Sequence, residues 1–120
     1  MIRIGMFALA ALLVLRSDVT GEWEASYGTP LGPQELKMYL KQEGPRISGH
    51  TTSEFGEATI RGSIAGDEVK LSWTDTDGGK TLEIAVTAKI DGDTITGTAR
   101  LGDRGEGRFR AERSSSASAR

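Results

Sequence analysis

The sequence predicts an all-β domain, namely one eight-stranded antiparallel up-and-down barrel. From Thr20 onward, apolar and polar side chains alternate with a period of two, which is typical of half-buried strands. Short segments rich in glycine and aspartate interrupt this alternation at regular intervals. The chain holds 16 glycines and only 3 prolines, a ratio that indicates many turns and bends. A two-sheet β-sandwich is the alternative fold.

The alternation divides the chain into eight predicted strands. They span residues 21–27, 34–42, 46–52, 57–65, 69–75, 82–90, 94–101 and 106–113. A loop is expected at residues 28–33, and the DTDGG run at 75–79 is the strongest hairpin signal. Because the connections are short, neighbouring strands should pair antiparallel. Closing the sheet would remove its unpaired edges, which favours the barrel.

The two ends of the chain differ in character from the middle. Arg3 precedes a short apolar run at residues 4–15, as in an export signal, although no small-x-small cleavage site follows. We therefore expect an export signal or an uncleaved anchor at residues 1–17, the barrel at 18–113 and a disordered polar tail at 114–120. The protein is expected to be exported to the periplasm or the extracellular space, and to meet a membrane only through the N-terminal segment.

Composition excludes several classes of function. The net charge of −2 provides no basic surface for nucleic acid, and the absence of cysteine excludes disulfides and thiolate chemistry. The single histidine, His50, is predicted on the outer face. The Asp-Gly turns lack the acidic residue that completes a calcium loop. Neither a metal nor another cofactor is expected, and the oligomeric state is left open.

The start of the first strand resembles a known family signature. Thr20-Gly21-Glu22-Trp23 is similar to the Gly-x-Trp motif of the calycin superfamily, which includes lipocalins and avidin-type barrels. In that superfamily the tryptophan packs at the closed end of the barrel, and a basic residue from a late strand covers it. The resemblance implies that Trp23 and Arg113 form a structural floor, held by a cation–π contact. The C-terminal helix of lipocalins and the avidin ligand-binding set have no match here.

The inward positions above this floor are first rich in glycine and alanine and then aromatic. One interpretation is a ligand cavity; the other is that glycines permit strong coiling while large side chains fill the interior. Under the first interpretation, the expected ligand-binding residues are Tyr27, Leu36, Met38, Thr51, Phe55, Ile60, Trp73, Val86, Ala99 and Phe109.

The sequence thus predicts an exported barrel that binds a small apolar or amphipathic molecule. One alternative is a structural or accessory interaction domain with a filled barrel. Another is a small enzyme of the cyclase or isomerase type, with Tyr27, Glu54 or Asp75 near the mouth. Glu54 and Glu57 form a candidate carboxylate pair, although a solvated loop explains them more simply. No catalytic residue is assigned.

Overall fold

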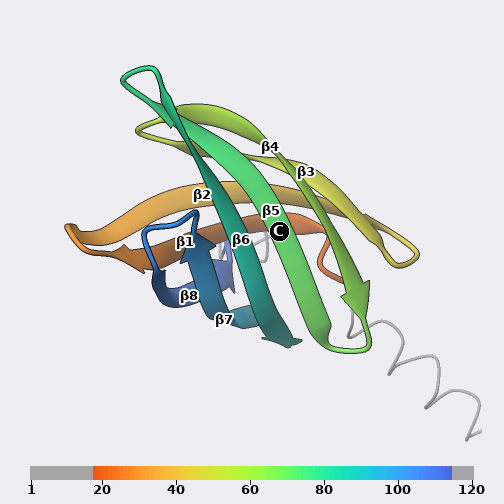
Figure 1. The fold of residues 1–120 in the computed structure, drawn as a ribbon. Coiled ribbons are helices and arrows are strands. Elements are labelled where there is room, and N and C mark those ends of the chain that lie inside the picture. Colours follow the sequence, from red (N-terminus) through yellow and green to blue (C-terminus); the bar gives the residue numbers. More distant parts are fainter. Residues whose placement is uncertain (1–17, 115–120) are drawn as a thin grey trace, which may run out of the picture.

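The protein is an all-β closed barrel in which eight antiparallel strands follow one another in chain order (Figure 1). The computed structural model describes residues 18–114. The strands are β1 (Gly21–Thr29), β2 (Gly32–Glu43), β3 (Arg46–Ser53), β4 (Gly56–Ala65), β5 (Glu68–Asp77), β6 (Lys80–Asp91), β7 (Thr94–Leu101) and β8 (Glu106–Arg113). Pairing of β1 with β8 closes the sheet. The predicted up-and-down barrel is confirmed, and the sandwich alternative is wrong.

The expected leader at residues 1–17 and the tail from residue 115 lie outside the described residues. Ser114, which the sequence places in the tail, is the last described residue. Its side chain is buried, and its backbone N–H donates a hydrogen bond to the Glu22 carbonyl. The barrel therefore extends one residue beyond its expected end.

Two hairpins are longer than the sequence indicates. The predicted loop at residues 28–33 is wrong, because β1 and β2 remain paired up to Thr29 and Gly32. Pro33 pairs with Gly28 of β1 but lies at an edge of β2, since the pairing of β2 with β3 begins only at Lys37, and proline is tolerated at such an edge position. The β5–β6 turn is likewise reduced to Gly78 and Gly79, whose positive φ angles of 61° and 84° suit a tight hairpin turn.

One end of the barrel is packed around Trp23. The indole is fully buried, and its N–H donates to the Val19 carbonyl at 2.8 Å. Arg113 lies directly opposite Trp23 in the β1–β8 register, with its guanidinium carbon 4.4 Å from the ring centroid. The same guanidinium donates to the Thr20 carbonyl and pairs with Asp93, each at 2.8 Å. These contacts connect the N-terminal segment, the last strand and the β6–β7 turn at this end.

Three glycines on β3, β4 and β7 allow the strands to coil tightly. A Cβ atom at Gly49, Gly62 or Gly97 would collide with a backbone carbonyl oxygen of the neighbouring strand. The oxygens belong to Tyr39, Lys70 and Thr87, respectively. These three glycines therefore allow neighbouring backbones to approach closely, and they do not create an open interior.

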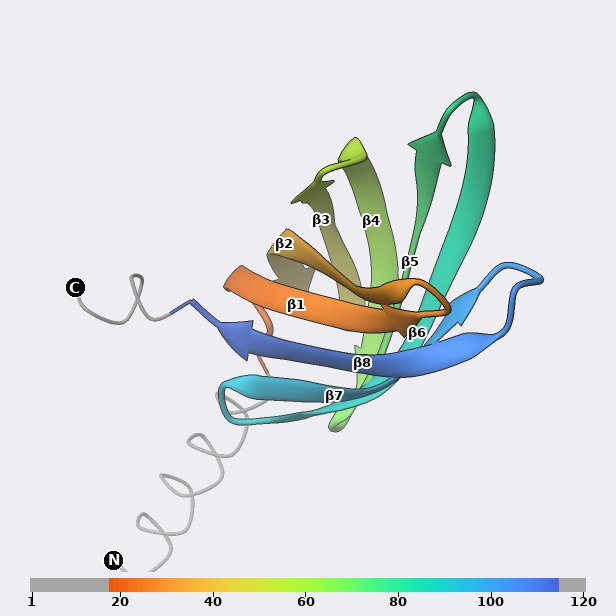
Figure 2. The ribbon, with the colours of Figure 1, turned by 90° about the vertical axis from the view of Figure 1, so that its left-hand side faces the viewer.

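At the opposite end, the mouth, the hairpins separate from one another (Figure 2). Pairing of β2 with β3 stops at Lys37 and Thr52, and pairing of β4 with β5 stops at Arg61 and Ser72. The β1–β2, β3–β4 and β5–β6 hairpins therefore extend past the last shared hydrogen bonds. Their ends surround the mouth without closing it.

Replacing Trp23 with alanine should lower the free energy of unfolding by about 3–5 kcal/mol, because it leaves a large void beneath Arg113. Chemical denaturation of this variant measures the loss. Leu31→Ala is the control, since that side chain is 99% exposed at the mouth and should cost little. A Trp23→Ala variant as stable as the parent would contradict the packing role of this residue.

Gly62→Ala should lower the free energy of unfolding by about 1–3 kcal/mol, because the added Cβ would collide with the Lys70 carbonyl across the β4–β5 pair. The matched control is Gly28→Ala, whose Cβ would lie 3.7 Å from the nearest atom, an ordinary contact. Thermal unfolding of both variants separates the two sites. Equal melting temperatures would show that tight coiling does not require this glycine.

Candidate functional site

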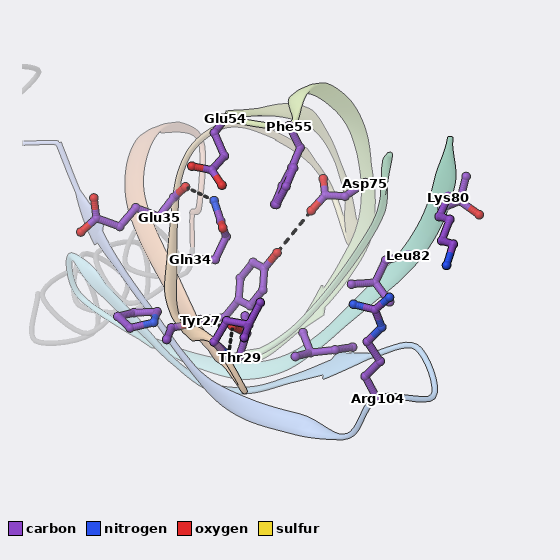
Figure 3. Close-up of a pocket in the computed structure, with 15 residues that line it drawn as sticks. Tyr27, Thr29, Gln34, Glu35, Glu54, Phe55, Asp75, Lys80, Leu82 and Arg104 are labelled. Carbon is purple, nitrogen blue, oxygen red and sulfur yellow. Dashed lines mark hydrogen bonds between the residues drawn. The ribbon is translucent and has the colours of Figure 1, made fainter. Parts of the chain in front are cut away.

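The mouth encloses a cavity of about 970 Å³ (Figure 3). Its walls come from the separated hairpin ends and from the β7–β8 turn. Two structural facts place it there: the strands stop pairing before their hairpins end, and the hairpins lean apart (Figure 2). The candidate site is therefore a product of the splayed mouth.

Tyr27 and Asp75 meet at the base of the cavity, from opposite walls. Their side chains are only 3% and 8% exposed, and the Tyr27 hydroxyl donates a hydrogen bond to Asp75 Oδ2 at 3.2 Å. The period of two explains both positions. Asp75 follows the inward-facing Leu71 and Trp73 along β5, and Tyr27 follows Trp23 along β1. Figure 3 shows the pair in the centre of the site.

Burial governs the ionisation of both groups. It raises the pKa of the Asp75 carboxyl, while the hydrogen bond from Tyr27 acts in the opposite direction. The nearby Trp73 indole also favours the carboxylate, although its N–H does not reach hydrogen-bonding geometry. Burial, together with the charge of Asp75, raises the pKa of Tyr27 well above its usual range. Tyr27 is therefore a permanent donor, and Asp75 titrates at higher pH than an exposed aspartate.

Trp73 lies beside this pair. Its ring centroid is 6.3 Å from that of Tyr27, and the two planes are tilted by 57°. Its indole Nε1 is buried and has no hydrogen-bond partner among the described residues, and the same holds for Thr51 Oγ1. A buried donor left unpaired costs about 1–3 kcal/mol. A buried donor beside the Tyr27–Asp75 pair, the Trp73 indole N–H, is thus left unsatisfied within residues 18–114.

The rim of the cavity combines apolar and charged side chains. Phe55, half-buried at the β3–β4 turn, points toward Tyr27 in Figure 3, and Leu82 packs against the core from β6. Buried Leu101 completes the apolar wall. Besides the buried Asp75, the charged groups in the lining are Glu35, Glu54, Lys80 and Arg104, all exposed. A molecule bound here would meet both apolar surface and charge.

Only two of the predicted ligand-binding residues, Tyr27 and Phe55, line this cavity. The other eight are buried in the packed interior or against its walls: Leu36, Met38, Thr51, Ile60, Trp73, Val86, Ala99 and Phe109. Sequence reasoning missed Gln34, Leu82, Leu101, Lys80 and Arg104 as lining residues. Two of them could have been found from the sequence, because Leu82 and Leu101 are in phase with the inward-facing residues of their strands and lie near the strand ends.

The remaining chemical candidates lie apart from the cavity or are exposed at its rim. His50 is exposed on the outer face, where it stacks on Tyr39 with ring centroids 4.7 Å apart. Glu54 lines the cavity, whereas its proposed partner Glu57 is exposed and does not. Within residues 18–114, no three acidic or histidine side chains gather as a metal site would require.

The fold and the site define a class: a small closed antiparallel barrel with one packed end and a polar–apolar cavity at the other. Comparison of the chain with models of known protein families and with curated protein sequences gives no match. Among residues 18–114 there is no helix with the length and apolar character that a bilayer crossing requires. The function must therefore be argued from the cavity itself.

Asp75→Asn should raise the melting temperature at neutral pH, because it removes a desolvated charge while leaving an oxygen to accept from Tyr27. The folded-state pKa of Asp75 is raised, so ionisation destabilises the fold. The gain should be complete above that raised pKa and vanish below the unfolded-state value of about 3.9.

Thermal unfolding from about pH 7 to pH 3 measures this difference. Asp103→Asn, in the exposed β7–β8 turn, should show no such pH-dependent gain. An Asp75→Asn variant that is less stable than the parent at neutral pH would show that the carboxylate is satisfied within the fold.

Proposed function

We propose that this chain is an exported, calycin-type binding protein that holds a small amphipathic molecule in its mouth cavity. The single observation that carries the proposal is the cavity of about 970 Å³ with the buried Tyr27–Asp75 pair at its base. Small-molecule sites occupy roughly 300–1,000 Å³ and combine apolar walls with a few convergent polar groups. This cavity has that size and that composition.

The contrast between the two ends of the barrel favours binding over a purely structural role. Around Trp23 the interior is filled, and the residues at mid-depth, such as Met38 and Ile60, are fully buried. A filled barrel throughout would support the accessory-domain alternative. Here the packed end instead supports hairpins that hold Tyr27, Asp75 and Phe55 around an open space. Rigid support for a hollow site is the arrangement that binding requires.

The ligand is amphipathic because the lining is divided. Leu82, Leu101 and Phe55 offer apolar contact, while Tyr27 and Asp75 offer hydrogen bonds at the base. A purely apolar molecule would add no polar partner for the buried carboxylate, whose side-chain donor among the described residues is the Tyr27 hydroxyl.

The calycin assignment is supported by the packed end. Gly21 and Trp23 stand at the start of β1, and Arg113 from the last strand lies over the Trp23 ring. This is the arrangement that the sequence resemblance implies. The proposal of export is supported by Arg3 and the apolar run that follows it.

A small enzyme is the second candidate. Asp75 lies in a cavity, its pKa is raised, and a hydroxyl is within hydrogen-bonding distance, so the pair has the features of a general base and its positioning donor. Chemical conversion of a bound molecule, rather than its simple retention, is what separates this candidate from the binding protein.

Native mass spectrometry of the full chain, purified from its own host, should detect a bound small molecule. Release and identification of that molecule, followed by incubation with fresh protein, would reveal any conversion. Recovery of it unchanged supports a binding protein, whereas a new mass supports the enzyme.

Fluorescence locates the binding site. In a Trp23→Phe variant Trp73 is the single tryptophan, and in Trp73→Phe it is Trp23. Titration with 1-octanol should change the emission of Trp73, which lies beside Tyr27, and leave that of Trp23 unchanged. No adduct from the host, together with no change in either variant across a series of alcohols, would overturn the proposed function.

A further inference from the structure

We infer that the mouth cavity selects molecules that carry a protonated amine, with the Asp75 carboxylate receiving the ammonium group between the rings of Tyr27 and Phe55. This inference rests on the proposed function, because it names the ligand class of the same site. It concerns the part of the cavity where a buried carboxylate and two aromatic side chains come together (Figure 3).

Asp75 lacks a cationic partner among the described residues. The five ion pairs among the described residues join other carboxylates, and none involves Asp75. Its Oδ2 accepts one hydrogen bond, from Tyr27, and no other side-chain bond to it is found between residues 18 and 114. Buried carboxylates are ordinarily paired with a cation or well supplied with donors. This one is completed by a cation that the fold does not provide.

Aromatic surface lies beside the Asp75 carboxylate. Tyr27 is bonded to Asp75, and the Phe55 ring points toward Tyr27 from the opposite hairpin in Figure 3. A cation that binds Asp75 would therefore lie near both rings. Attraction of an ammonium to aromatic faces adds to its attraction to the carboxylate, and both become stronger where water is excluded.

The other charged side chains of the cavity are divided between its two sides. Glu35 and Glu54 lie on one side of the cavity, and Lys80 and Arg104 lie on the other, next to Leu82 (Figure 3). All four are exposed, so solvent screens them and each contributes little. The buried carboxylate of Asp75 dominates the base of the site.

This arrangement also orients the ligand. The amine would bind Asp75 at the base, and the apolar part would rest on Leu82, the cross-strand neighbour of Asp75, and on Leu101. The ligand class is thus an organic amine with an apolar body small enough for a cavity of about 970 Å³.

Isothermal titration calorimetry with three molecules of equal chain length tests the inference: octylammonium, 1-octanol and octanoate. With the full chain at about pH 7.5, where the amine is protonated, octylammonium should bind at least about tenfold more tightly than 1-octanol. Octanoate should bind more weakly than either, because its carboxylate would face Asp75.

Asp75→Asn should remove the preference for the amine, so that octylammonium and 1-octanol bind with similar affinity. The matched control, Asp103→Asn, changes the same net charge in the exposed β7–β8 turn and should retain the preference. Circular dichroism of both variants confirms that they fold.

The parent protein provides a test that needs no variant. The preference for octylammonium should fall as the pH drops through the pKa of Asp75, which burial raises, since protonation removes the negative charge. Two groups lie beside Asp75: Tyr27, which stays protonated, and Trp73. The other charged groups of the cavity are the exposed side chains of Glu35, Glu54, Lys80 and Arg104. The affinity for 1-octanol should not follow this titration.

Equal binding of octylammonium and 1-octanol, or a preference for octanoate, would overturn the inference and leave the proposed binding function standing. An amine preference that persists in Asp75→Asn would also overturn it. If none of the three probes binds and no host ligand is found, the proposed function itself fails.

Discussion

The barrel depends on the closure of its sheet between the first and last strands. Five residues of β1, Trp23 to Tyr27, pair with β8, and Arg113 at the end of β8 lies over the Trp23 ring. The guanidinium also binds the Thr20 carbonyl and Asp93, and 23% of the side chain remains exposed. This one side chain therefore joins three segments that are distant in sequence. Without it, these three segments would lose their shared contacts at the end where the interior is packed.

Tight packing at one end and separation at the other are linked through the strands. Glycines at positions 49, 62 and 97 allow neighbouring backbones to approach closely where the barrel is narrow. Toward the mouth, the pairing of β4 with β5 ends at Arg61 and Ser72, and from there each hairpin extends without pairing to the neighbouring hairpin. A buried carboxylate at this boundary costs stability and finds no cation within the described fold. Such a group is typical of a site that is shaped for a partner rather than for stability.

Much of the fold could be predicted from the sequence, because the alternation of polar and apolar residues is local. It gave every strand and the inward face of each, including that of Trp73 and Leu82. The ends of the strands were harder to predict. Pro33 is a turn signal that lies inside β2, and the DTDGG run holds both the end of β5 and the turn at Gly78 and Gly79, so these signals mark the turns only approximately.

The site was less predictable for the same reason. A residue lines the mouth only where adjacent strands have stopped pairing, and that point depends on register across the whole barrel. The sequence placed Asp75 near the mouth and in phase with Trp73, but its burial and its hydrogen bond to Tyr27 could not be predicted from strand phase. Most of the predicted ligand-binding residues proved to be packed beneath the cavity, because strand phase alone does not show the depth at which an interior opens.

Nuclear magnetic resonance of the isotopically labelled full chain, titrated with 1-octanol, tests the central claim most directly. If the mouth is the binding site, the backbone amide signals of Tyr27, Phe55 and Leu82 should shift with a common saturation curve. The signals of Trp23 and Ile95, in the packed end, should stay in place. Shifts concentrated around Trp23, or no saturable shift at any position, would contradict the account.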